Sequence, residues 1–311
     1  MEERKTSRKK FWYNDNTVGY IFSLPFIIGF LAFTLIPIAV SMYYSVTDYK
    51  PMYYSVTDYK LGQTPAFIVI KNYLALLKDE RFINSVKVTL IYVVTSVPTK
   101  LIFALFVAYL LTQGRRGVTF YRSLYYVPSL IGGSIAVALV WKTIFSRKGL
   151  ANTILASLGL QKLSWLGDPK LSMGILVLMS AWQFGSSMII FAAGLKEIPG
   201  SYYEAAEIDG ANKWQRFLSI TLPCLSPIIL YNLVMQTITA FMAFTQAFVI
   251  TQGGPNDATN FYALYVYNHA FKWSNMGYAS AMSWLMLVLI SVITLILFKS
   301  SKFWVFSEAD Q

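Results

Sequence analysis

The sequence predicts an all-α polytopic membrane protein with six transmembrane helices, and three observations support this fold class. Hydrophobic residues make up 56% of the 311 residues and charged residues only 13%, with a mean hydropathy of +0.49. Soluble domains contain roughly 45–50% apolar and about 25% charged residues. Aromatic residues reach 16%, which suits bilayer interfaces, where amphipathic rings collect. Finally, six apolar runs are each long enough to cross a bilayer as a helix.

The first apolar run covers 18–43 and follows a tail over 1–17 that is rich in lysine and arginine. It is longer than the apolar region of a signal peptide, which spans roughly 7–15 residues. We therefore expect a cytoplasmic tail and then a transmembrane helix, with Pro25 and Pro37 as sites of kinks. Directly afterwards, the sequence of 42–50 is repeated without change at 52–60. Structural repeats have periods of roughly 20–50 residues, so we interpret this copy as a recent duplication that lengthens an external loop.

The other five runs cover 86–111, 121–145, 173–195, 223–251 and 278–298. The third contains Gly132, Gly133 and Ser134, small residues that allow helices to approach closely. An even number of spans places both termini on one side. The dense basic tail and the short loop with Arg115 and Arg116 favour the cytoplasmic side, because positive residues concentrate there. We therefore expect a transmembrane domain over 18–300 and a short cytoplasmic tail over 301–311.

Lys100 lies near the middle of the second run. A lysine at mid-bilayer costs about 2.5–3.5 kcal/mol, so such a residue normally faces the bundle interior or a wet cavity. Two interpretations follow. Lys100 could belong to a transport pathway and attract an anionic substrate, or it could pair with carbonyls or a carboxylate of a neighbouring helix.

The residue inventory excludes several kinds of chemistry. A single cysteine, Cys224, rules out an internal disulfide and a cysteine-cluster metal site. A single histidine, His269, cannot build a Ser–His or Cys–His dyad, and no glycine-rich phosphate-binding loop is present. The net charge of +11 sits in short segments between apolar runs, which fits membrane flanks rather than nucleic-acid binding. These observations indicate a conduit rather than an enzyme, so its energy must come from a gradient or a partner.

The loop over 196–222, between the fourth and fifth runs, has a pattern of its own. Ser201 and Glu204 match a capping box at the start of a helix, and Gly210 suits the left-handed position that ends one. Asn212 can cap a second short helix, which Pro223 redirects into the membrane. An interfacial helix-turn-helix explains this pattern, but connections between bundled helices usually take about 2–8 residues. The length of the loop therefore calls for a further reason.

The spacing Glu-Ala-Ala, three residues, Gly, nine residues, Ile-x-Leu-Pro supplies that reason. It occurs without a gap at Glu204, Ala205, Ala206, Gly210, Ile220, Leu222 and Pro223. The chain thereby resembles the membrane subunits of binding-protein-dependent ABC importers, and more narrowly the maltose-type carbohydrate permeases. Supporting stretches are Leu24-Pro25, Asn72-Tyr73 and the segments 165–169, 194–199 and 251–255. The resemblance implies the type I importer fold and a place in the bacterial cytoplasmic membrane.

The resemblance also implies partners and sites. The loop should be a coupling helix that docks on a cytoplasmic ABC ATPase dimer, with Ser201 and Glu204 in its first turn. The ATPase, and not this chain, would bind ATP and magnesium. A second, homologous permease subunit should complete the pore, and an external or periplasmic sugar-binding protein should deliver substrate. By position, the implied substrate-binding residues are Gln183, Phe184, Ser186, Ser187, Gln236, Thr239 and Thr245.

Two alternatives remain open at the level of sequence. Within the same class, the solute could be another compound, such as glycerol phosphate or a uronic oligosaccharide. From a different class, a gradient-driven secondary transporter commonly embeds carboxylates for ion coupling. The six predicted runs contain no Asp or Glu, which argues against that second class.

Overall fold

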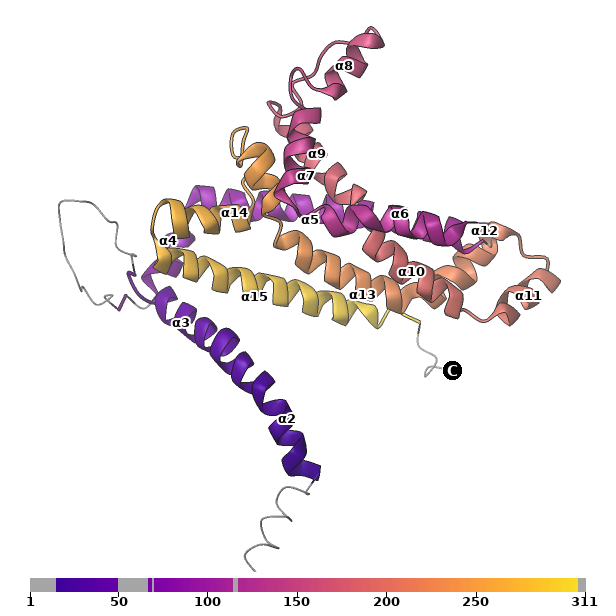
Figure 1. Cartoon of the computed structure of the whole chain (residues 1–311), viewed down its shortest axis with the longest axis horizontal. Coiled ribbons are helices and arrows are strands. Elements are labelled where there is room, and N and C mark those ends of the chain that lie inside the picture. The colour runs from indigo at the N-terminus through magenta and orange to yellow at the C-terminus, as the bar shows by residue number, and fades with distance from the viewer. Residues whose placement is uncertain (1–14, 50–66, 69, 114–116, 307–311) are drawn as a thin grey trace, which may run out of the picture. The chain divides into compact units, whose positions relative to one another are not determined.

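The computed structural model describes residues 15–49, 67–68, 70–113 and 117–306. Helices are the regular elements within these ranges (Figure 1). Most of the basic tail, the second repeat copy at 52–60, Arg115 and Arg116 lie outside the described residues. The chain divides into two compact units, one of residues 1–74 and 269–284, the other of 75–268 and 285–311.

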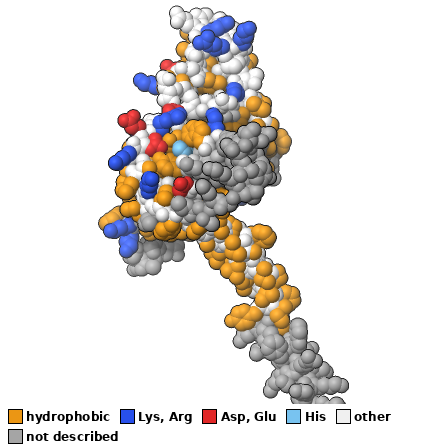
Figure 2. All heavy atoms as spheres, turned by 90° about the vertical axis from the view of Figure 1, so that its left-hand side faces the viewer, with side chains coloured by type: hydrophobic (Ala, Val, Ile, Leu, Met, Phe, Trp, Pro, Cys, Tyr) orange, Lys and Arg blue, Asp and Glu red, His pale blue; other side chains and the backbone are white. Residues whose placement is uncertain are grey.

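The first unit begins with one long apolar helical run. This run consists of α2 (Asp15–Phe30), the π-helical segment η1 (Leu31–Leu35) and α3 (Ile36–Ser45). Its membrane-spanning part, Val18–Ser45, contains no charged residue, and Figure 2 shows hydrophobic side chains covering the visible side of this helix. The wider π turn lies just before Pro37, and the Ile36 N–H donates across it to Leu31 O. A π turn is a common way to relieve a local conflict in a helix, here with a proline ring that lacks an N–H.

Hydrogen bonds within the first unit fix the end of α3. The amide of Asn72, in α4 (Lys71–Leu76), donates to Ser45 O at 2.9 Å and to Thr47 O at 3.0 Å. At the start of α15 (Met276–Ser301), the Gly277 N–H donates to Tyr49 O at 2.9 Å. A Cβ on Gly277 would overlap the backbone here, so this position requires glycine. Residues 42–49 of the first repeat copy therefore have a defined place in the fold.

The second unit is built around α5 (Glu80–Thr112), which packs against α6, α9, α10, α13 and α14. Asp79 caps this helix by accepting the N–H groups of Arg81 and Phe82. The buried face of α5 joins a core contributed mainly by α9, α10 and α13, and its largest fully buried members include Leu176, Met179, Met188, Phe191 and Phe241.

The bounds of the remaining helices define where the chain bends. They are α6 (Val118–Ile131), α7 (Ile135–Ile144), α8 (Leu150–Ser157), α9 (Pro169–Trp182), α10 (Gly185–Glu197), α11 (Gly200–Ile208), α12 (Lys213–Arg216), η2 (Phe217–Thr221), α13 (Leu222–Phe241), η3 (Ala247–Thr251), α14 (Tyr262–Tyr267) and η4 (Asn268–Lys272). Four helical runs in the described residues are long and apolar enough to cross a membrane, or up to six if each bent pair counts as one span. The predicted class of an all-α, multi-span protein is confirmed.

Two of the predicted spans are wrong as single straight helices. The run 121–145 is divided into α6 and α7, which meet at 97°. Gly132 ends the first helix, and the Ser134 hydroxyl accepts the Val137 N–H to cap the second. The run 223–251 is interrupted too, because α13 ends at Phe241 and helix resumes only near η3. The fourth run, 173–195, also bends, by 44° between α9 and α10.

Candidate functional site

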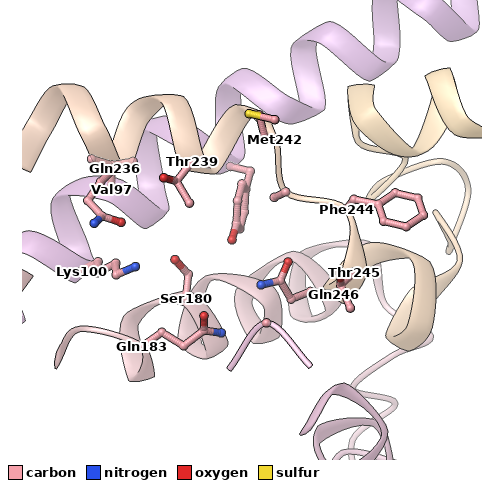
Figure 3. A pocket seen from close by; sticks show the side chains of 14 residues that line it. Val97, Lys100, Ser180, Gln183, Gln236, Thr239, Met242, Phe244, Thr245 and Gln246 are labelled. Atoms are coloured by element: carbon pink, nitrogen blue, oxygen red, sulfur yellow. The ribbon is translucent and has the colours of Figure 1, made fainter. Parts of the chain in front are cut away.

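The helix breaks of the second unit meet around a polar cavity of about 220 Å³ (Figure 3). The wall comes from α5, from Gly133 between α6 and α7, from the α9–α10 break and from the end of α13 with the segment that follows it. Irregular backbone is tolerated at membrane depth where it is buried in protein or lines a cavity. Discontinuous helices also form the substrate sites of many transporters. The arrangement therefore marks the cavity as the candidate site.

Gln183 stands at the bend between α9 and α10. One serine satisfies the backbone groups that this bend frees: the Ser129 hydroxyl donates to Gln183 O at 3.0 Å and accepts the Ser186 N–H at 3.0 Å. The Gln183 side chain crosses to the other break and donates through Nε2 to Gly132 O at 3.3 Å. A Cβ on Gly132 would overlap this side chain. Of the three small residues predicted to allow close approach, Gly132 does so here.

Lys100 reaches the same cavity from α5 and is only 9% exposed. Figure 3 shows its ammonium directed into the space that the polar ends of Ser180 and Gln246 also enter. Among the described residues, Lys100 makes no ion pair or hydrogen bond. Lys142 in α7 differs, because its Nζ donates to Val249 O at 3.0 Å. Of the two interpretations of Lys100, the geometry favours a cavity-facing residue over a partner for a neighbouring helix.

The cavity brings together four of the seven residues predicted to bind substrate, Gln183, Gln236, Thr239 and Thr245. The other three lie off its wall. Phe184 is buried against Phe103 and Tyr125, the Ser186 N–H is bound by Ser129, and the fully buried Ser187 hydroxyl has no partner in the described residues.

Sequence reasoning missed further lining residues, notably Tyr92, Ser180, Phe244 and Gln246. Tyr92 and Ser180 sit in apolar helical runs, where nothing local separates a pathway residue from a core residue. Gln246 was visible as a polar residue in the fifth run, but its role depends on the break after Phe241.

The loop over 196–222 contains the predicted helix-turn-helix, and Gly210 is its turn. Gly210 has φ +78°, and its N–H donates to Glu207 O at 3.1 Å, while the Ala211 N–H donates to Ala206 O at 2.9 Å. These two bonds form a Schellman motif, in which a left-handed residue after the helix end satisfies the last carbonyls. The predicted role of Gly210 in ending the first helix is confirmed.

The predicted capping box at Ser201 and Glu204 is wrong. Pro199 is the N-cap of α11, no side chain caps it, and Ser201 already lies in the first turn. A capping box does occur at the next helix: the Asn212 side chain accepts the Trp214 and Gln215 N–H groups, and Gln215 accepts the Asn212 N–H. The proline before Gly200 therefore sets the start of α11, and Glu204 is left exposed.

Side chains hold the two arms of the loop together. The Tyr203 hydroxyl lies 2.9 Å from the Thr221 hydroxyl, and Arg216 pairs with Glu207 at 3.0 Å. Outside these contacts, the surface of α11 is open: Glu204 and Ala205 are exposed, and Ile208 is 87% exposed. A folded loop that presents an acidic residue and an apolar residue to its surroundings suits docking on another protein.

The second arm is not a separate short helix, as was predicted. Helix runs without a gap from Lys213 to Phe241, through η2. The π turn again lies just before a proline, here Pro223, and the Leu222 N–H donates to Phe217 O. Ile220, Leu222 and Pro223 of the predicted motif are half-buried in this run. The fifth span and the second arm of the loop therefore form one continuous helix.

Broken membrane-spanning helices around a polar cavity, together with an exposed helical loop, define a membrane transport subunit. Comparison with known proteins gives the family: residues 72–303 match the model of the binding-protein-dependent transport system inner membrane component. The chain belongs to this family. It is therefore a transport subunit rather than an enzyme.

Individual relatives agree with this assignment. The chain is 49% identical to the probable ABC transporter permease protein YesP of Bacillus subtilis, covering 100% of this chain and 97% of that protein. It is 32% identical to the trehalose/maltose transport system permease protein MalF of Thermococcus litoralis, covering 97% and 99%. Its fold matches, with a TM-score of 0.77 and 23% identity, a chain of a bacterial alginate ABC transporter in complex with an alginate pentasaccharide-bound periplasmic protein, covering 95% of this chain and 96% of that one.

Proposed function

We propose that this chain is the permease subunit of an ATP-driven importer for a sugar or oligosaccharide. The observation that carries the proposal is the cavity wall, which contains six neutral side chains with amide or hydroxyl groups: Ser180, Gln183, Gln236, Thr239, Thr245 and Gln246. Amides and hydroxyls both donate and accept hydrogen bonds, which matches the many hydroxyls of a sugar. The cavity wall has no Asp or Glu among the described residues, although ion-coupled carriers commonly place one within the membrane.

The cavity volume supports a shared pathway. About 220 Å³ is below the roughly 300–1,000 Å³ of typical ligand pockets. We infer that this chain supplies one wall of the site and that a second, homologous permease supplies the other. Relatives named for sugar transport, such as the trehalose/maltose permease MalF, support the choice of solute.

The exposed α11 surface supports a role in coupling. We infer that the loop docks on a separate cytoplasmic ABC ATPase, with Glu204 and Ile208 at the contact. That ATPase would bind ATP and magnesium, and closure of its dimer would move the loop and alternate the access of the sugar site. This assignment places the loop and both termini on the cytoplasmic side, while an external binding protein delivers the sugar on the other side.

The test is ATPase stimulation of the reconstituted full complex by binding protein loaded with individual members of a sugar panel, with glycerol 3-phosphate as a non-sugar control. Stimulation and uptake with at least one sugar are expected. Stimulation by glycerol 3-phosphate with no response to any sugar would overturn the choice of solute. Uptake that continues without ATP and follows an imposed ion gradient would overturn the ATP-driven mechanism itself.

A further inference from the structure

The charge balance of the cavity is uneven. Of the 14 described residues that line it, Lys100 is the one that carries a charge at neutral pH, and no carboxylate is among them. An ammonium removed from water is costly unless an opposite charge or hydrogen bonds compensate it. The remaining wall offers amides and hydroxyls but no anion. Among the described residues, nothing on this wall compensates the ammonium, so an anion that enters the cavity can pair with it.

We propose that the cavity binds an acidic sugar, and that the Lys100 ammonium pairs with the carboxylate of a uronic oligosaccharide. This inference rests on the proposed function, since it names the substrate class of the same site. Hydrogen bonds between ions of opposite charge are shorter and about twice as strong as neutral ones. The neutral side chains around Lys100 would hydrogen-bond the hydroxyls of the same sugar ring. The site would thus recognise both the carboxylate and the hydroxyls.

Lys142 shows that a lysine in this fold can be satisfied by a hydrogen bond within the chain. It belongs to α7, and its Nζ already donates to a backbone carbonyl, Val249 O, at 3.0 Å. It is absent from the cavity wall. Lys100, by contrast, is buried to nine-tenths and points into the space itself. The two lysines share a chemical group and a helical setting, so Lys142 provides the matched control.

The experiment measures uptake by the reconstituted full transporter of uronic oligosaccharides and of the same oligosaccharides as neutral methyl esters, with glycerol 3-phosphate as a second anion. The wild-type complex should import a uronic oligosaccharide. Lys100→Met should lower the acidic-to-neutral uptake ratio by about tenfold or more, equivalent to about 1.4 kcal/mol or more. Lys100→Arg should recover much of the ratio, and Lys142→Met should leave it unchanged.

A second variant covers the case in which Lys100→Met does not assemble. Gln236→Glu places a carboxylate on the wall of the same cavity, where it would compete with the sugar acid for Lys100. It should lower acidic uptake more than neutral uptake.

The outcomes separate this inference from the proposed function. Equal loss of acidic and neutral uptake in Lys100→Met, or an unchanged ratio, overturns the role of Lys100. Wild-type uptake of only neutral sugars overturns the acidic substrate and leaves sugar transport standing. A complex that imports glycerol 3-phosphate but no sugar of either kind overturns both. If only the acidic sugars are imported, equal uptake by Lys100→Met and Lys142→Met would refute the pairing.

Discussion

Replacing Gly210 with alanine should weaken the coupling of ATP hydrolysis to transport. Gly210 has φ +78°, and an L-residue forced into that left-handed conformation costs roughly 1–2 kcal/mol. A Cβ at this position meets no atom within 4 Å, so the cost arises from the backbone alone. It must be compared with the contacts that hold the loop closed.

Those contacts are few. The Tyr203–Thr221 hydrogen bond contributes about 0.5–1.5 kcal/mol. The Arg216–Glu207 pair involves a Glu207 side chain that is 73% exposed, so it contributes about 0.2–1 kcal/mol. The strain in Gly210→Ala is thus comparable to the side-chain support. We expect the ratio of folded to unfolded turn to fall by a factor of about 5–30. The apparent affinity for the ATPase should then fall with the fraction of molecules in which the turn is folded.

The assay is substrate-stimulated ATPase activity of the reconstituted complex, together with the affinity of the membrane subunits for the ATPase. Gly210→Asn is the informative comparison, because asparagine tolerates the left-handed conformation, and it should stay near wild type. Gly200→Ala changes a glycine at the start of α11 that has open space around it, and it should be neutral. The reasoning is refuted if Gly210→Ala matches wild type, or if Gly210→Asn is as damaging as Gly210→Ala.

Three further predictions concern the cavity and the second arm of the loop. Gly132→Ala should displace the Gln183 side chain, because the two would overlap, at a cost of about 1–3 kcal/mol; Gly133→Ala, which meets nothing within 4 Å, should melt like wild type, and equal melting temperatures for both variants would contradict this account. Gln236→Ala should raise the sugar concentration needed for half-maximal uptake while the complex still assembles, and an unchanged concentration dependence would remove Gln236 from the site. Asn212→Ala should lower loop stability by about 1 kcal/mol through loss of the cap, detectable as faster amide exchange at Trp214 and Gln215, and unchanged exchange would argue against the cap.

The membrane spans and the turn at Gly210 could be predicted from the sequence, since long apolar runs and a left-handed glycine have local causes. The break in the fifth span and the full set of cavity-lining residues could not. Nothing in the sequence near Phe241 resembles a helix stop, because no glycine or proline follows it until Gly253. The break after Phe241 is therefore tertiary in origin, and so is the recruitment of Tyr92 and Ser180 to the cavity. Which polar residue of an apolar run lines a cavity depends on how the neighbouring helices pack, and the sequence of that run does not show this.

The capping-box error has a different source. Ser201-x-x-Glu204 and Asn212-x-x-Gln215 both fit the pattern, yet only the second forms it. Proline is favoured at the boundary of a helix, where its missing N–H is not needed, and Pro199 occupies that boundary for α11. Pro199 and Ser201 are therefore two valid signals for the start of the same helix, two residues apart. The sequence alone does not show which of them sets the start.

The connectivity of the second unit links the loop to the cavity through two helices. α10 begins beside Gln183 at the cavity and ends at Glu197, next to the loop. The run that begins at Lys213, on the other arm of the loop, ends at Phe241, and its last turns line the cavity through Gln236 and Thr239. These two helices pack closely, since a Cβ on Gly194 would overlap the Ile228 side chain. In the proposed mechanism, a displacement of the loop by the ATPase is therefore transmitted along both helices at once. The displacement thereby reaches the α9–α10 bend and the break after Phe241, which bound the site. The backbone there lacks regular helical hydrogen bonds, so it can change conformation at the lowest cost in free energy.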